Sequence, residues 1–116
     1  MAVEGNLLTE VSREGGLSVL RLDGELDLAS APLLESEVQA AMADDPAAIA
    51  LDLRGLEFID STGLRAILSL DERCAGRGLK FALVRGSEQV ERLLSMTRVA
   101  EHLQIVDSPE ELRLQL

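Results

Sequence analysis

The chain has 116 residues, of which 47% are hydrophobic and 28% are charged, and its formal net charge is -10. This composition predicts one folded domain, residues 1–116, and excludes a disordered tail, whose apolar content would be too low to offset chain entropy. The acidic charge disfavours binding to nucleic acid or to an anionic membrane, and the near absence of aromatic residues disfavours base stacking. We therefore expect protein partners; acidity that serves solubility alone is the other explanation.

The sequence has one cysteine, Cys74, and one histidine, His102. A lone cysteine cannot form an internal disulfide, and the two residues cannot supply the three or four ligands of a zinc site. The first residues show no basic cluster followed by a long apolar run, and about 18 apolar residues never stand together. We expect a cytoplasmic protein with no metal, no cofactor and no membrane insertion.

The first half of the chain predicts a β-hairpin, a helix and a buried strand. Segments 7–11 and 17–22 have strand patterns and are joined across Gly15-Gly16. From Ser30, a plausible N-cap, apolar residues then fall at the spacing of an amphipathic helix: Leu34, Val38, Ala41 and Met42. The nearly continuous apolar run 48–53 is typical of a strand covered on both faces.

The second half alternates helices with strands. The patterns predict helices over about 61–74 and 87–96, a strand over 79–84 and an edge strand over 103–106. Ser108 stands three residues before Glu111, with a proline between them, which is a capping-box start for a short last helix.

Together these elements predict an α/β domain with a mixed, mostly parallel sheet of four to five strands and about four helices. Because parallel strands share an end, the loops after Leu22, Leu53 and Val84 should gather at one edge of the sheet. These loops carry the segments 23–27, 54–61 and 85–87. Function in open α/β folds is usually found at this edge.

The most informative stretch is Phe58-Ile59-Asp60-Ser61-Thr62-Gly63-Leu64, which places a carboxylate and two hydroxyls at a predicted helix start. Unpaired N–H groups and the helix dipole would tolerate a phosphoryl group there. Simple capping is the competing interpretation, because Asp, Ser and Thr are preferred N-cap residues.

This stretch, with Leu51-Asp52-Leu53 before it and Gly24-Glu25-Leu26-Asp27 earlier, resembles the STAS domain family, and within it the free-standing anti-sigma factor antagonists. The resemblance covers nearly the whole chain. It implies a STAS-like fold in which an anti-sigma factor that is also a serine kinase phosphorylates Ser61. It further implies that only the unmodified form binds this factor, which frees a sigma factor for transcription, and that a serine phosphatase can reverse the mark.

The resemblance also indicates which residues meet the kinase. Asp27 would lie near the phosphorylated serine and orient it or contact the kinase, unless it is only a turn or cap residue. Asp60 would hold the Ser61 hydroxyl, and Thr62 is a second acceptor that the family motif disfavours. The exposed side of the same helix continues the docking surface unless it is merely solvated. The expected partner-binding residues are Asp27, Asp60, Thr62, Gly63, Leu64, Arg65 and Ser69, with Glu72 and Arg73 further along.

Three other features stay outside the motif. Arg85 either pairs with a phosphate on Ser61 or, as we prefer, offsets nearby carboxylates, and Cys74 is expected in the core. Many family members end the third helix with a glycine, where this chain has Ser95-Met96-Thr97-Arg98-Val99, so that helix needs a different cap.

Other functions remain as alternatives. A small STAS protein can instead be the subunit that docks on the ATPase of a bacterial lipid-transporting ABC system, or a stressosome scaffold, although scaffolds commonly carry an additional domain. An enzyme is disfavoured, because the sequence has no glycine-rich phosphate loop and no catalytic constellation with plausible spacing. Weak nucleotide binding near Asp27 and Ser61 stays open, and we expect a monomer or a weak dimer.

Overall fold

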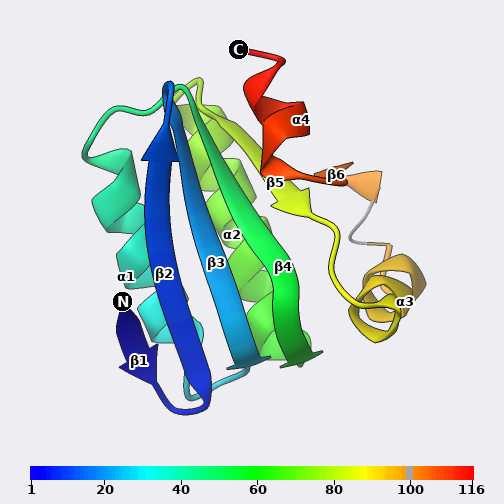
Figure 1. Cartoon of the computed structure of the whole chain (residues 1–116). Coiled ribbons are helices and arrows are strands. Elements are labelled where there is room, and N and C mark those ends of the chain that lie inside the picture. Colours follow the sequence, from blue (N-terminus) through cyan, green and yellow to red (C-terminus); the bar gives the residue numbers. More distant parts are fainter. Residues whose placement is uncertain (99–100) are drawn as a thin grey trace.

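A single mixed sheet organises the protein (Figure 1). The computed structural model describes residues 1–98 and 101–116, and within these the sheet has six strands in sequence order. They are β1 (Ala2–Glu4), β2 (Leu7–Glu14), β3 (Leu17–Leu26), β4 (Ala48–Ile59), β5 (Lys80–Val84) and β6 (Gln104–Val106). The first three strands are antiparallel and β3 to β6 are parallel. The predicted α/β class is confirmed, but the sheet exceeds the expected four to five strands because β1, too short to show alternation, pairs with Leu7–Thr9.

The helices are α1 (Ala31–Met42), α2 (Ser61–Gly76), α3 (Glu88–Met96) and α4 (Pro109–Arg113). The parallel strands follow one another in a single direction across the sheet, and right-handed crossovers therefore place the helices between them on the same face. The larger core cluster joins α1, α2 and α3 to that face, and a smaller one packs Leu112 of α4 on the other. Figure 1 shows α2 behind the strands and α4 in front of them.

Two parallel strands are longer than the sequence pattern predicted. We expected ends at Leu22 and Leu53, but β3 continues to Leu26 and β4 to Ile59. The ladder between them passes register shifts after Arg21 and Gly24 and then pairs Leu26 with Ile59. Polar residues hid this extension, because a strand with one open face can carry charges on that face.

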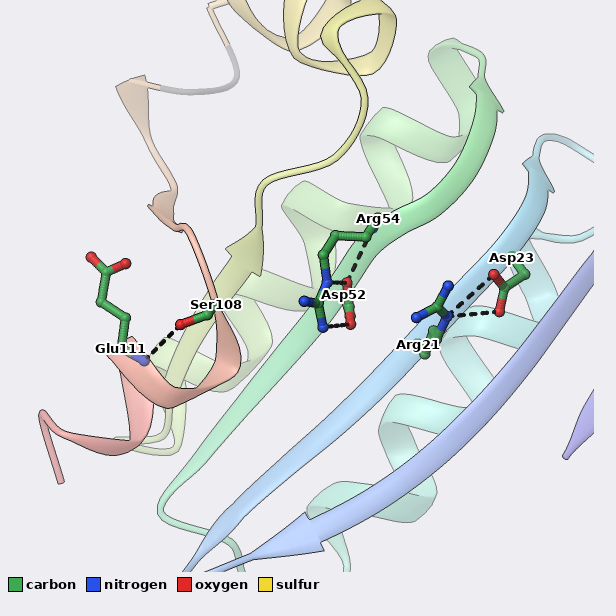
Figure 2. A network of polar contacts seen from close by, with 6 residues as sticks. All are labelled: Arg21, Asp23, Asp52, Arg54, Ser108 and Glu111. Carbon is green, nitrogen blue, oxygen red and sulfur yellow. Dashed lines mark hydrogen bonds and ion pairs between the residues drawn. The ribbon is translucent and has the colours of Figure 1, made fainter.

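The charges on the open face form the polar network of Figure 2. Asp52 is 2% exposed, and its carboxylate accepts hydrogen bonds from Nε and Nη2 of Arg54 at 2.9 and 2.7 Å. Burial would raise the pKa of Asp52, but the hydrogen bonds from Arg54 outweigh it and hold that pKa below its ordinary value. On the neighbouring strand, Arg21 Nε donates to both carboxylate oxygens of Asp23 at 3.2 Å.

The end of α3 uses a hydroxyl and a left-handed residue in place of the family's glycine. The Thr97 hydroxyl donates to the carbonyl oxygens of Leu93 and Leu94 at 3.0 and 3.1 Å. Arg98 then takes a positive φ of 60°, the backbone conformation that glycine usually supplies. Val99, the last residue of the segment singled out from the sequence, lies outside the described residues.

Candidate functional site

The ends of β3 and β4 bring two predicted loops together. Leu26 and Ile59 are register partners, and the Asp60 N–H donates to the Leu26 carbonyl oxygen at 3.1 Å. Asp27 and Asp60 therefore follow neighbouring strand ends, as the shared edge of parallel strands predicted.

The third predicted loop does not reach this edge. β5 ends at Val84, which pairs with Asp52 near the middle of β4, so the segment 85–87 stands well short of Asp60. Arg85 donates from Nε to Asp107 at 2.9 Å and from Nη1 to Glu91 at 3.3 Å. The preferred interpretation, that Arg85 offsets nearby carboxylates, is confirmed; the expected gathering of all three loops was wrong, because β4 is longer than its apolar run.

Asp60 is the N-cap of α2 and Ser61 is the first helical residue. The Asp60 Oδ1 accepts a hydrogen bond from the Gly63 N–H at 2.9 Å, and the Asp60 carbonyl oxygen accepts from Leu64 N–H at 3.0 Å. The carboxylate is thus bonded to the backbone and not to the Ser61 hydroxyl, contrary to expectation. Ser61 is exposed, and its hydroxyl makes no hydrogen bond to any part of the chain that the structure describes. Thr62, the second hydroxyl, is half-buried.

Gly63 lets the first turn of α2 approach β3. A Cβ atom at this position would lie 2.8 Å from the Leu26 carbonyl oxygen and 2.9 Å from Cγ1 of Ile59. Such distances are far inside van der Waals contact, so only glycine fits without movement of the backbone. Gly63 and Leu64 are both buried and hold the turn that carries Ser61; their part in partner binding stays a prediction.

Asp27 holds the turn that leads into α1, whose N-cap position is Ser30. The Asp27 Oδ1 accepts hydrogen bonds from the backbone N–H groups of Ala29 and Ser30 at 3.0 and 3.1 Å. Ser30 is the N-cap of α1 by position, as predicted, but its buried side chain makes no cap hydrogen bond and instead donates to the Glu25 carbonyl oxygen at 2.9 Å. The hydrogen bonds of the Asp27 carboxylate therefore agree with the interpretation of Asp27 as a turn or cap residue. Asp27 nevertheless lies at the same edge of the sheet as Asp60 and Ser61.

The outer side of α2 is exposed along its length. Arg65, Ser69, Glu72 and Arg73 are all exposed, as the helical pattern predicted. Arg65 Nε donates to the Ser61 carbonyl oxygen at 3.4 Å, so its guanidinium lies along the first turn. Cys74, on the opposite side, is fully buried, and burial raises the pKa of its thiol, as expected of a core cysteine.

Sequence reasoning missed two apolar side chains at this end of the sheet. Leu28, directly after Asp27, is 74% exposed, and Phe58, two residues before Asp60, is 45% exposed. Phe58 pairs with Glu25, and together with Ile59 it lines a depression against α3. Strand alternation could not have found Phe58, because the end of β4 does not alternate: Leu56 and Ile59 are buried, and the two residues between them are both exposed.

Residues 1–98 and 101–116 contain no helix that is long and apolar enough to cross a membrane. The same residues contain no group of three or more His, Cys, Asp or Glu side chains that could hold a metal ion.

The sheet order, the packing of α1, α2 and α3 on one face and the motif at the start of α2 define a known class of domain. The STAS domain family model matches residues 9–112, and the chain belongs to this family. It is 35% identical to the anti-sigma-F factor antagonist RsfB of Mycobacterium tuberculosis over 88 residues, which cover 75% of this chain and 71% of RsfB.

Other relatives carry the same description. An anti-sigma F factor antagonist of Paenibacillus polymyxa is 30% identical over 104 residues, which cover 89% of each chain. Among solved structures, an anti-sigma factor antagonist from Mycobacterium paratuberculosis matches with a TM-score of 0.83 and 28% identity, covering 94% of this chain and 92% of that one. Small bacterial regulators of this kind are therefore its relatives in sequence and in structure.

Proposed function

We propose that this protein is an anti-sigma factor antagonist that binds an anti-sigma factor with serine kinase activity, frees a sigma factor, and is switched off by phosphorylation of Ser61. One observation carries the proposal: Ser61 presents an exposed, unbonded hydroxyl on the first turn of α2. The resemblance described above assigns the acceptor to the same residue. Its neighbour Thr62 is less accessible, which supports Ser61 as the acceptor.

The local electrostatics support a switch. A phosphoryl group adds about -1.5 to -2 charges at neutral pH. The helix N-terminus tolerates this charge in the free protein, because the first N–H groups of α2 point toward it. In a complex, the phosphate and the Asp60 carboxylate would have to lose water side by side, at a cost in desolvation and mutual repulsion. Phosphorylation should therefore weaken binding more than it weakens the fold.

In this scheme the protein is a substrate and a binding partner. The base and the magnesium ion for phosphoryl transfer come from the kinase, and a serine phosphatase restores the active form. Asp27 and Asp60 follow the paired ends of β3 and β4 beside the acceptor, and Arg65 and Ser69 extend the docking surface along α2. The protein acts in the cytoplasm, with the sigma factor that it releases.

The test uses tagged wild-type, Ser61→Ala and Ser61→Asp proteins to capture partners from a lysate of the native host. An ATP-binding anti-sigma factor should be retained by Ser61→Ala and lost with Ser61→Asp. Ser12→Asp is the matched control, because it adds the same charge to an exposed serine of β2 that pairs with Val19, far from the strand ends beside Ser61.

Two results would contradict the proposal. Equal recovery of an anti-sigma factor by Ser61→Ala and Ser61→Asp would show that a charge at Ser61 does not control binding. Equal recovery of a transporter ATPase by all variants would replace the function with docking on an ABC system, and Ser61 would then be only a residue of the first helical turn.

A further inference from the structure

A shallow apolar groove lies beside the candidate switch, between the end of β4 and α3. It has a volume of about 230 Å³. Its apolar lining comes from Phe58 and Ile59 of β4 and from Val90, Leu93 and Met96 of α3, and its polar lining comes from Glu57, Gln89 and Arg92. Phe58 is 45% exposed and Met96 is 75% exposed, so apolar surface meets solvent on both walls. Figure 1 shows α3 set apart from α1 and α2, beyond the end of β5.

The groove is continuous with Ser61 along the chain. Phe58 and Ile59 immediately precede Asp60, the N-cap of α2, and the Asp60 N–H is bonded to the end of β3. A partner that covers Ser61 from the side of β4 therefore meets this groove next. Exposed methionine and aromatic side chains beside a shallow depression are typical of protein-docking surfaces.

The charged side chains around the groove indicate which kind of partner segment it can bind. Two charged residues line the groove, the exposed carboxylate of Glu57 and the exposed guanidinium of Arg92. Arg92 Nη2 lies 3.8 Å from Oε1 of Glu88, an exposed carboxylate one turn earlier in α3, so its charge is offset next to the groove. Glu25, Asp27 and Asp60 add carboxyl groups at the adjacent strand ends, in a chain of net charge -10. Two such rims would repel each other, which disfavours a second copy of this chain, and a basic segment would be attracted.

We propose that this groove binds a segment of the anti-sigma factor in which an aliphatic side chain, seated between Phe58 and Met96, is flanked by lysine or arginine. This inference rests on the proposed function and deepens it, since it names the chemistry of the partner next to the switch. For phosphorylation to weaken binding, the attraction between those basic side chains and a phosphate on Ser61 must be smaller than the cost of burying that phosphate beside Asp60. Substitutions in the groove and at Ser61 can therefore be tested separately.

The experiment measures the dissociation constant of the unphosphorylated protein for the purified anti-sigma factor by isothermal titration calorimetry. Met96→Asp should weaken binding at least about tenfold, because it puts a charge where an apolar side chain docks. Leu114→Asp is the matched control: Leu114 is 77% exposed at the other end of the molecule, and its change should leave affinity within about twofold.

A second pair of variants tests the charge. Glu57→Lys should weaken binding several-fold, with an effect that shrinks as ionic strength rises, since rim charges act mainly at long range. Glu14→Lys, an exposed reversal beside the hairpin turn, should have little effect. A photo-crosslinking residue at position 96 should join an aliphatic residue of the anti-sigma factor that has basic neighbours.

The outcomes separate the two proposals. Failure of the wild-type protein to bind any anti-sigma factor overturns the proposed function, and the groove inference with it. Binding that is lost in Ser61→Asp but is equal for Met96→Asp and Leu114→Asp overturns the groove inference alone. A crosslink from position 96 to a second copy of this chain, or to an acidic segment, overturns it as well.

Discussion

The start of α2 differs from the starts of α3 and α4, although all three have a serine. In α3 and α4 the serine is the N-cap, and its hydroxyl accepts a backbone hydrogen bond: Ser87 from Val90 N–H at 3.2 Å, and Ser108 from Glu111 N–H at 3.3 Å. In α2 an aspartate takes that role, and the serine is moved one residue into the helix.

This shift frees one hydroxyl. Because Asp60 satisfies the Gly63 N–H, Ser61 is not needed for capping and its side chain faces solvent. The hydroxyl of Ser30, before α1, also makes a hydrogen bond, which it donates to the Glu25 carbonyl oxygen. A kinase can therefore reach the Ser61 hydroxyl without unfolding a helix end. At the other helix starts the serine hydroxyl already makes a hydrogen bond within the chain.

The largest effect should follow from a change in the turn that presents Ser61. Gly63→Ala places a methyl group 2.8 Å from the Leu26 carbonyl oxygen and should lower the free energy of unfolding by about 1–3 kcal/mol. Gly76→Ala is the control, because a Cβ there meets nothing within 4 Å. Urea unfolding of both variants provides the measurement, and equal stability would show that α2 does not need its close approach to β3.

The next effect separates stability from switching. Arg54→Ala leaves the buried Asp52 carboxylate without its bidentate partner and should cost about 1–3 kcal/mol at neutral pH, discounted because Arg54 is half exposed. Binding to the anti-sigma factor should stay within about twofold of wild type, since Asp52 and Arg54 lie on the open face of the sheet near α4, away from the start of α2 (Figure 2).

The pH dependence of that loss has a definite sign. The pKa of Asp52 is lower in the folded chain than in the unfolded chain, so its contribution is fully present above the unfolded value and is lost as pH falls through the folded value. The difference between wild type and Arg54→Ala in urea titrations should therefore shrink at acid pH. A difference that grows as pH falls would assign the stabilisation to another group.

The smallest effect tests the comparison of helix starts itself. Ser87→Ala removes an N-cap hydrogen bond and should lower the free energy of unfolding by about 1 kcal/mol. Ser61→Ala removes no hydrogen bond within the described residues and should change it by less than about 0.5 kcal/mol. Thermal unfolding of the pair is sufficient; a Ser61→Ala protein as destabilised as Ser87→Ala would mean that Ser61 has a capping role.

Much of this arrangement could be predicted from local pattern. The capping box at Ser108 and Glu111, the inward position of Cys74 and the helix that begins at Ser61 each depend on neighbours in sequence, and the structure confirms them. The extension of β3 and β4 could not be predicted in this way, because it depends on pairing between distant segments and a register shift near Arg21. The same long-range pairing carries β4 on to Phe58 and Ile59, whereas the bond from Gly63 N–H to Asp60 is a local N-cap contact of the kind that capping preference predicts.

The most direct test of the switch is to incubate the protein with the anti-sigma factor kinase, ATP and magnesium, and to map the product by mass spectrometry. The account predicts one phosphate per chain, on Ser61, and none on the capping serines Ser87 and Ser108 or on Ser61→Ala protein. A phosphate on Thr62, on a capping serine, or retained in full by Ser61→Ala would contradict it.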